Sequence, residues 1–504
     1  MRWELDWLDS RARLTPDAAA IAAAGTDQEW SYREVNERAR AIAAWLQGKG
    51  VKKGDRIALL APNGVSYFDL LFACGKIGAI FVPLNWRLSV EELAFIIQDS
   101  EPALLAFHSK FTKEVTMVWD QAGECIQIDG SQYQDLIAGP KQIQLVEKLD
   151  EEDPLAMIYT GGTTGKPKGA VLSHRAIIWN SISTIASWNL TGADKTITYL
   201  PLFHTGGLNA LSIPILMAGG TVVLADDFIP EKAIEFLIRH KCTIVLFVPT
   251  MHHMLVKSEK FQQAEFMDMK LFLSGGAPCP LDIYEAYKQK GLAFKEGYGL
   301  TEAGPNNFFI DPSDADIKRG SVGKPMLFTS IKVIRDDGSD APAGEIGELA
   351  IRGKHAFSYY WKNDSATENT WKDGSLHTGD LARQDEEGYF YIVGRKKEMI
   401  ITGGENVYPL EIEHWLSSHP SIREAAVIGV VDEKWGEAVT AFIVLETEAA
   451  LNGEKIKEYC RKKLAGFKVP KQIHFITQMP KTHVGKIDKK QLKEMASEKQ
   501  KPVS

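Results

Sequence analysis

The residues from Tyr159 to Gly169, Y-T-G-G-T-T-G-K-P-K-G, combine the types of group that bind phosphate. Their four glycines allow tight backbone turns, so amide N–H groups can surround an anion without interference from Cβ atoms. Three threonine hydroxyls and two lysine ammonium groups add hydrogen-bond donors and positive charge. The apolar run Ala156–Tyr159 predicts a short buried strand that leads into this loop. We therefore expect the loop to bind a polyphosphate.

This loop differs from the P-loop of kinases and GTPases, whose pattern is G-x-x-x-x-G-K-[ST]. The spacing from Gly161 to Gly165 is one residue short, and Pro167 follows Lys166 where the pattern requires Ser or Thr. A phosphotransferase or ATPase built on a P-loop is therefore disfavoured. Taken alone, the loop also has an ordinary interpretation as a solvated turn.

The composition is typical of a soluble globular enzyme, because 44% of the 504 residues are hydrophobic and 25% are charged. The net charge of −8 argues against nucleic acid as a partner. Five scattered cysteines without a C-x-x-C pair favour reduced thiols and a cytoplasmic location. The first six residues are too polar for a signal peptide.

The most apolar run, Leu208–Ala225, is interrupted by Asn209, Pro214 and a pair of glycines. We expect buried strand and turn there, and no membrane span. Peripheral contact with a membrane stays open.

Helical and strand patterns alternate along the first half of the chain. Apolar strands at 56–62 and 79–83 flank a helical stretch, and Ser31 with Glu34 forms a capping-box pattern before an earlier helix. This alternation predicts an α/β fold, with a large N-terminal region of mainly parallel strands covered by helices on both faces.

The pattern changes after Gly320. Strands at 331–334 and 349–351, separated by polar turns, predict a small β-rich section. Strands at 425–431 and 439–445 predict a small, mobile α+β domain at the C-terminal end.

Six further motifs follow the phosphate loop. They are Pro201-Leu202-Phe203-His204, Gly275-Gly276-Ala277-Pro278, Tyr298-Gly299-Leu300-Thr301-Glu302, Thr378-Gly379-Asp380, Gly394-Arg395-Lys396-Lys397 and Pro480-Lys481-Thr482-x-x-Gly485-Lys486. In this order they resemble the motifs of the adenylate-forming (AMP-binding) superfamily, which includes acyl-CoA synthetases, peptide-synthetase adenylation domains and luciferases. The usual family loop has Ser where this chain has Gly161, which removes one side-chain donor but leaves the backbone able to bind.

The resemblance implies a site for ATP and Mg²⁺ at these motifs. The residues that it assigns to ATP or AMP are Thr160, Gly161, Gly162, Thr163, Thr164, Gly165, Lys166, Lys168, Gly276, Ala277, Pro278, Gly297, Tyr298, Gly299, Thr301, Asp380 and Arg395. Among them, the Tyr298 ring and the backbone near Gly276 and Ala277 would contact adenine. Glu302 would bind the Mg²⁺ that bridges the ATP phosphates, because hard cations prefer carboxylate oxygen. Lys486 would catalyse adenylation by contacting the attacking carboxylate and the α-phosphate, with Thr301 and His204 at the same centre. No general base is expected, because a carboxylic acid is already ionised at neutral pH.

The resemblance also implies two domains and a second half-reaction with coenzyme A. We expect an AMP-binding domain over 1–394 and a lid domain over 395–504, with the hinge at Lys397. The residues expected to contact CoA are Arg87, Gly403, Gly404, Trp435 and Lys471. The glycine pair would leave room for the pantetheine arm.

The substrate acid is less clearly indicated. Amino-acid-activating relatives have Asp immediately after the Phe of the motif that Phe203 occupies, whereas this chain has His204, which favours a plain carboxylic acid. The residues expected to line the acyl pocket are His204, Gly206, Gly275, Ala303 and Gly304.

Over its length the chain resembles bacterial medium- and long-chain fatty-acid–CoA ligases most. An o-succinylbenzoate–CoA ligase, an aryl-CoA ligase, and an adenylating enzyme that loads a carrier protein or oxidises its acyl group remain alternatives. A monomer and a homodimer are both compatible with the sequence.

Overall fold

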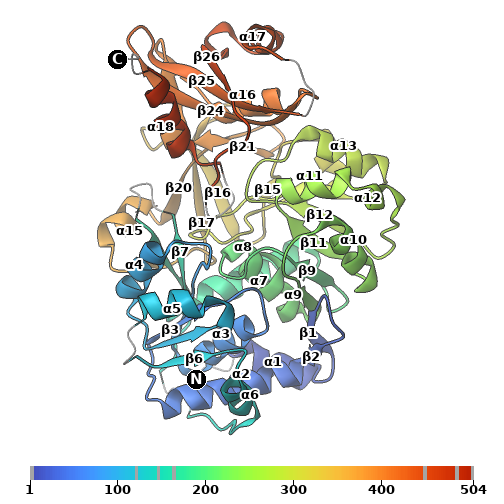
Figure 1. Cartoon of the computed structure of the whole chain (residues 1–504), viewed down its shortest axis with the longest axis vertical. Coiled ribbons are helices and arrows are strands. Elements are labelled where there is room, and N and C mark those ends of the chain that lie inside the picture. Colours follow the sequence, from blue (N-terminus) through green and yellow to red (C-terminus); the bar gives the residue numbers. More distant parts are fainter. Residues whose placement is uncertain are drawn as a thin grey trace.

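The computed structural model describes residues 5–119, 123–144, 148–161, 166–446, 451–482 and 487–500, with the backbone alone for 498–500. Figure 1 shows a broad lower part, in blue to green, and a smaller upper part, in orange and red. Strands coloured yellow to light orange lie between them. We call the elements through β21 the N-terminal unit and those from β22 onward the C-terminal unit.

The largest sheet has seven strands in the order β18-β8-β7-β4-β3-β5-β6. Its strands are β3 (Arg56–Leu60), β4 (Ile80–Pro83), β5 (Leu104–Phe107), β6 (Cys125–Gln127), β7 (Pro154–Thr160), β8 (Lys168–Ser173) and β18 (Tyr359–Tyr360). The pairs from β7 to β6 are parallel, whereas β7–β8 and β8–β18 are antiparallel. The predicted phosphate loop thus connects the two strands of one hairpin, β7 and β8.

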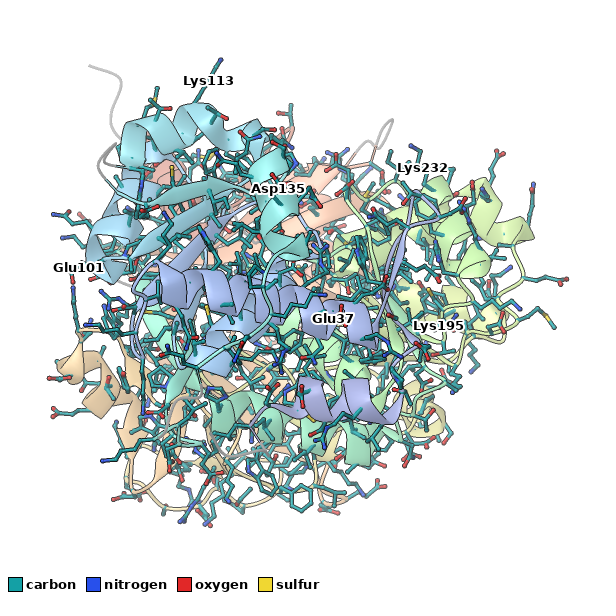
Figure 2. The ribbon with its side chains drawn as sticks, turned by 90° about the horizontal axis from the view of Figure 1, so that it is seen from below. Glu37, Glu101, Lys113, Asp135, Lys195 and Lys232 are labelled. Atoms are coloured by element: carbon teal, nitrogen blue, oxygen red, sulfur yellow. The ribbon has the colours of Figure 1, made fainter. Side chains whose placement is uncertain are left out.

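Helices of the first part of the chain pack around this sheet. They are α1 (Trp7–Leu14), α2 (Tyr32–Gly48), α3 (Ser66–Ile77), α4 (Val90–Ser100), α5 (Thr112–Val118) and α6 (Ser131–Ala138), with the 3-10 turn η1 (Ser109–Phe111). The predicted capping box begins α2, because Ser31 Oγ accepts the Glu34 N–H and the Glu34 carboxylate accepts the Ser31 N–H. Seen from below, α2 crosses the molecule with Glu37 on it and Asp135 of α6 nearby (Figure 2).

Two smaller sheets complete the α/β layers. One has the order β2-β1-β10-β9, with β1 (Ala19–Ala23), β2 (Glu29–Ser31), β9 (Lys195–Thr198) and β10 (Thr221–Leu224). The other is parallel and consists of β11 (Ile244–Phe247), β12 (Leu271–Ser274) and β13 (Phe294–Glu296). Their helices are α7 (His174–Trp188), α10 (Pro230–Arg239), α11 (Pro249–Lys257), α12 (Glu259–Gln263) and α13 (Leu281–Gln289).

The apolar run Leu208–Ala225 corrects one expectation. Strand β10 confirms the predicted strand at its end, but the residues before it are helical, in α8 (Thr205–Gly207), the π-helical η2 (Leu208–Ser212) and α9 (Ile213–Ala218). Pro214 lies in the first turn of α9, where an N–H group is not needed for the helix, so it does not break the run. Within the described residues, no helix is both long and apolar enough to cross a membrane.

The predicted β-rich section is an antiparallel sheet in the order β16-β17-β20-β19, with β21 paired to β20. It contains β16 (Thr329–Ile334), β17 (Gly347–Gly353), β19 (Trp371–Lys372), β20 (Ser375–Gln384) and β21 (Phe390–Arg395). Beside it lie β14 (Phe308–Phe309), β15 (Lys324–Pro325), α14 (Pro312–Ile317) and α15 (Asp364–Thr370).

The C-terminal unit has its own five-stranded sheet and its own core. The strands are β22 (Ile400–Thr402), β23 (Glu405–Val407), β24 (Ile422–Asp432), β25 (Gly436–Leu445) and β26 (Gln472–Phe475). The helices are α16 (Pro409–Ser417), α17 (Gly453–Arg461) and α18 (Lys489–Gln500), with the 3-10 turns η3 (Lys396–Glu398), just before this unit, and η4 (Gly466–Lys468). The predicted fold class, mainly parallel α/β layers with a β-rich section and a small α+β unit, is confirmed.

Candidate active site

Two glycine-containing loops meet at the carboxyl ends of the parallel neighbours β12 and β13. The first is Gly275–Pro278, in which Gly276 has φ +85°, a conformation that favours glycine. The second is Gly297–Gly299, and its Gly297 N–H donates to Ser274 O over 2.8 Å. A Cβ atom on Gly299 would lie 2.1 Å from the carbonyl oxygen of Pro305, so only glycine fits there. The residues predicted to contact adenine are therefore adjacent.

Tyr298, Asp380 and Arg395 form a hydrogen-bonded cluster beside these loops. Tyr298 donates its hydroxyl proton to Asp380 Oδ2 over 2.5 Å, and Arg395 Nε lies 2.8 Å from Asp380 Oδ1. Burial, followed by the charge of Asp380, raises the pKa of Tyr298 well above its ordinary value. Asp380 and Arg395 face each other in the register of β20 and β21. Three residues from distant motifs are thus brought to one place.

Glu302 lies between the phosphate loop and β18. Its Oε1 atom accepts the Tyr360 hydroxyl over 2.7 Å and the Thr160 hydroxyl over 3.4 Å. Thr160 is the last residue of β7, so Glu302, the predicted magnesium ligand, lies at the start of the phosphate loop. Thr301 precedes Glu302 in the chain. Tyr360 was not predicted from the sequence, because it lies 58 positions away from Glu302 and belongs to no motif.

The described ends of the phosphate loop approach the same place. Thr160 pairs with Lys168 in the β7–β8 register, and the Lys168 ammonium lies 5.2 Å from the centroid of the Tyr360 ring. Lys166 instead lies over the ring of Phe95, 5.7 Å from its centroid. A Cβ atom on Gly161 would meet no atom of the described residues within 4 Å, so none of them would obstruct the family serine. The predicted residues Gly162, Thr163, Thr164, Gly165 and Lys486 lie outside the described residues.

The predicted acyl-pocket glycines differ in the space around them. An added Cβ atom would approach Asn180 Oδ1 at 3.0 Å on Gly304, and on Gly206 the nearest atom would be 3.8 Å away. On Gly207, which was not among the predicted residues, it would clash with Pro201 O at 2.2 Å. The Pro201 backbone therefore requires glycine at Gly207 and the Asn180 side chain restricts the site at Gly304, whereas Gly206 leaves space. Gly275 is intermediate, with Leu246 Cδ1 at 3.2 Å, and Ala303 is fully buried.

His204 stands at the entry to the helical segment α8–η2. Its ring centroid lies 4.5 Å from that of Phe203, and its backbone N–H donates to Pro201 O. The π-helical turn η2 that follows is a rare form, frequent at functional sites. Buried side-chain amides secure this segment: Asn180 Nδ2 donates to Asn209 O over 2.8 Å, and Asn306 Nδ2 to Ala210 O over 2.7 Å.

Gly403 and Gly404 form the two-residue turn of the β22–β23 hairpin, with φ +60° and +85°. Gly403 donates its N–H to Trp435 O over 2.8 Å, and a Cβ atom on it would lie 3.2 Å from the Trp435 ring. The Lys471 ammonium lies 5.0 Å from the centroid of the same ring. Four of the five predicted CoA contacts are thus neighbours on the C-terminal unit.

The fifth, Arg87, lies on the N-terminal unit in a cleft of about 660 Å³. Its guanidinium lies 4.9 Å from the centroid of Trp86 and 5.9 Å from that of Phe203, next to His204. Burial lowers the pKa of Arg87, and the charge of Asp227 opposes that shift. The Lys110 ammonium also lies over the Trp86 ring, 5.3 Å from its centroid, and Lys110 lines the same cleft.

The predicted hinge residue, Lys397, lies in η3, where the chain leaves β21 and approaches β22. Its neighbour Lys396 pairs with Asp336 over 2.8 Å and with Glu348 over 3.4 Å, and both partners belong to the N-terminal unit. Glu398 pairs with Lys489 of α18 over 2.9 Å. The residues on either side of Lys397 thus contact different units.

Comparisons with known proteins agree with this geometry. The family model described as "AMP-binding enzyme" matches residues 8–361, and "AMP-binding enzyme C-terminal domain" matches 411–486. A feruloyl-CoA synthase of Amycolatopsis sp is 37% identical, over 95% of this chain and 96% of its own. The long-chain-fatty-acid–CoA ligase FadD13 of Mycobacterium tuberculosis is 33% identical, over 97% and 98%.

Among solved structures, the o-succinylbenzoate CoA synthetase of Bacillus subtilis in complex with its acyl-adenylate superposes with a TM-score of 0.88. It shares 32% sequence identity and covers 97% of this chain and 98% of its own.

Proposed function

The chain belongs to the AMP-binding enzyme family, in its acyl-CoA synthetase branch, and from this premise we propose its reaction. A carboxylic acid attacks the α-phosphate of ATP to give acyl-AMP and pyrophosphate, and the CoA thiol then displaces AMP to give acyl-CoA. The enzyme is thus an AMP-forming acid–thiol ligase whose substrates are the acid, ATP and CoA. The observation that supports it most is that Glu302, beside the phosphate loop, and the Tyr298–Asp380–Arg395 cluster belong to the motifs that resemble those of the family and occur in one fold.

The side chains of the cluster suit an adenosine group. Asp380 can accept hydrogen bonds from both ribose hydroxyls while Arg395 holds its carboxylate in place. Tyr298 can lay its ring against adenine, since its hydroxyl is already anchored on Asp380. Binding in this way would hold the α-phosphate in reach of the acid.

The single carboxylate of Glu302 suits Mg²⁺. Within the described residues, no group of three or more His, Cys, Asp and Glu side chains could hold a metal ion. The ion would take its other ligands from phosphate oxygens and water, as Mg²⁺ commonly does, and would supply charge neutralisation for the departing pyrophosphate. Glu302 is oriented for this role by the Tyr360 hydroxyl, 2.7 Å away.

Two sites support CoA as the acceptor. The Gly403–Gly404 turn presents two residues without side chains next to Trp435, so a slim pantetheine arm has room there. The Arg87 cleft offers a cation beside aromatic rings, which suits the phosphorylated nucleotide end of CoA. A carrier protein would present its thiol on the same kind of arm but has no nucleotide end, so the Arg87 cleft is the feature that favours CoA over it.

For the acid, we propose a fatty acid of medium to long chain, in line with the sequence-based prediction. Support comes from His204, which offers no carboxylate to a substrate ammonium group, and from the open space at Gly206. The similarity to a feruloyl-CoA synthase favours an aryl acid as the second candidate, and o-succinylbenzoate is a third. All three belong to the same acyl- or aryl-CoA ligase reaction.

The test is a product analysis with a panel of acids. The purified protein receives ATP, Mg²⁺ and CoA with saturated fatty acids of four to sixteen carbons, ferulate, o-succinylbenzoate and an amino acid. We expect AMP, pyrophosphate and a thioester, with kcat/KM rising along the fatty series, since each buried CH₂ contributes about 0.8 kcal/mol. Formation of ADP would refute the reaction, whereas ferulate or o-succinylbenzoate preferred many-fold over every fatty acid would refute only the acid.

A further inference from the structure

Glu296 is a buried carboxylate directly beneath the two loops predicted to bind adenine. It ends β13, is 6% exposed and lies one residue before Gly297. Its Oε2 atom accepts the backbone N–H of Cys279 over 2.9 Å, and its Oε1 atom accepts the Tyr284 hydroxyl over 2.5 Å. Cys279 directly follows Gly276–Pro278, so one side chain ties the end of the first loop to the start of the second.

The groups around this carboxylate supply no opposite charge. Tyr284 comes from α13 and Cys279 from the loop, while Asp282, at the start of α13, acts on the Cys279 thiol. The adjacent Lys295 points to the other face of β13, where its ammonium lies 4.4 Å from the ring centroids of both Trp188 and Phe309. Among the ion pairs of the described residues, none involves Glu296.

We infer that Glu296 is a positioning residue for the nucleotide, holding the loop Gly275–Pro278 against the base through its bond to Cys279. The inference rests on the proposed ATP site and extends it to a residue that touches no substrate. Backbone groups can recognise the edge of a base only if their loop is held in one conformation, because ordering a mobile loop on binding costs conformational entropy. The Cys279 N–H has no other acceptor among the described residues, and the remaining hydrogen bond of Cys279 joins its thiol to Ser274 at the end of β12, so loss of the carboxylate would loosen this end of the loop.

The protonation state of Glu296 sets the strength of both bonds. Burial raises its pKa to about 7, and the bonds from Tyr284 and Cys279 oppose this shift. An ionised carboxylate accepts both bonds with the help of its charge, whereas a protonated carboxyl group donates to Tyr284 and accepts the Cys279 N–H only as a neutral group, which makes the bond to Cys279 weaker. Since the pKa lies above the ordinary value of 4.5, protonation occurs as the pH falls through about 7. The affinity of the protein for the nucleotide should therefore decrease as the pH falls.

Adenosine is the probe, because it has no group that titrates near neutrality and lacks the phosphates of ATP. Its affinity for the full-length protein is measured by calorimetry from pH 6 to pH 8.5, which requires no catalysis. We expect adenosine to bind the wild-type protein several-fold more weakly at pH 6 than at pH 8, with a limit of about tenfold per pH unit. Glu296→Gln keeps the shape and cannot titrate, so its affinity should not change with pH.

Two further variants separate positioning from a general loss of structure. Lys295→Met removes the neighbouring buried titratable group on the other face and should keep the wild-type slope. Tyr284→Phe removes a bond that lowers the pKa of Glu296, so the midpoint of the profile should move to higher pH. Circular dichroism confirms that each variant is folded.

The outcomes are distinct. A flat wild-type profile with intact adenosine binding, or a slope that survives in Glu296→Gln, would overturn this inference and leave the ligase reaction untouched. Absence of adenosine and ATP binding at every pH would overturn the nucleotide site and this inference together. A slope lost in Glu296→Gln and kept in Lys295→Met would establish the positioning role.

Discussion

At the scale of single residues, Lys295 is the most unusual buried group of the protein. Its ammonium has two aromatic faces as neighbours, and desolvation lowers its pKa to about 7, although Asp311 opposes the shift. An aromatic face attracts a cation, but more weakly than water solvates it in bulk. At acidic pH the folded protein therefore contains a buried and poorly solvated positive charge at Lys295.

We predict that Lys295→Met stabilises the protein at pH 6, by about 1–4 kcal/mol, as apolar replacements of buried charges often do. Between about pH 7 and the ordinary value of 10.5, the unfolded chain binds a proton here that the folded chain does not. Wild-type stability therefore rises with pH in this window, and the advantage of Met shrinks. Thermal unfolding midpoints at pH 6 and pH 9 measure this. An equal advantage at both values would contradict the assigned pKa.

Glycines show how far single residues could be predicted. Gly161 and Gly299 look equivalent in the sequence, since both lie in glycine-rich motifs. In the structure a Cβ atom on Gly161 would meet none of the described residues within 4 Å, but on Gly299 it would lie 2.1 Å from Pro305 O. The difference depends on the chain around Pro305 folding back against Gly299, and no local sequence pattern indicates this contact.

At the scale of elements, the sequence predicted strands and helices well where one face is consistently apolar, and motif residues well where they lie on one loop. It missed Tyr360 and Glu296 as contributors to the site, because each acts across strands through a partner in another motif. It also misassigned Leu208–Ala218, since a short, fully buried apolar run has no polar face to reveal its period.

The β22–β23 hairpin carries a prediction of its own. Gly404 has φ +85° and open space around it, so Gly404→Leu would place a bulky side chain where the pantetheine arm is expected. We expect pyrophosphate release without CoA to stay near normal, while thioester formation from supplied acyl-AMP falls by at least tenfold. Lys486→Ala should do the reverse and slow adenylation by about 10²–10³.

The strain of leucine at positive φ needs a control. Gly50→Leu provides one, because Gly50 has φ +83°, equally open surroundings and a place between α2 and β3, outside the motifs. Normal thioester formation in Gly50→Leu, beside failure in Gly404→Leu, would assign the effect to the hairpin. If both half-reactions fall equally in Gly404→Leu, the hairpin has no special role with CoA.

At the scale of the whole molecule, the two units are joined at η3, by the contact of α16 with β21, and by an exposed ion pair. Lys257 of α11 meets Glu446 over 2.7 Å, with side chains 55% and 31% exposed. Such surface pairs contribute about 0–1 kcal/mol, so they would not hold the units in a single arrangement. We propose domains over 1–394 and 395–504 that rotate about Lys397, bringing Lys486 and then Gly403–Gly404 to the same acyl group.

Limited proteolysis tests the proposed boundary. Trypsin should cut the free protein first at Arg395–Lys397, because a hinge must unfold locally more easily than the elements around it. Addition of ATP with an accepted acid should slow that cut by several-fold, as one arrangement becomes dominant. Mass spectrometry identifies the site, and an inert nucleotide such as GTP serves as the control. First cuts elsewhere, unchanged by ATP, would argue against this hinge.

The position of the phosphate loop in a β-hairpin has a consequence for how ATP is attracted. In a strand–loop–helix arrangement, the aligned peptide dipoles of the helix contribute a fixed partial charge of about +0.5 at the phosphates. Here the described residues that follow the loop form β8 and no helix, so the positive potential beyond the backbone N–H groups comes from ammonium groups such as those of Lys166 and Lys168. Solvent-exposed charges are screened over about 8–10 Å at physiological salt. Nucleotide capture by this enzyme should therefore depend on ionic strength more steeply than capture by a helix-backed loop.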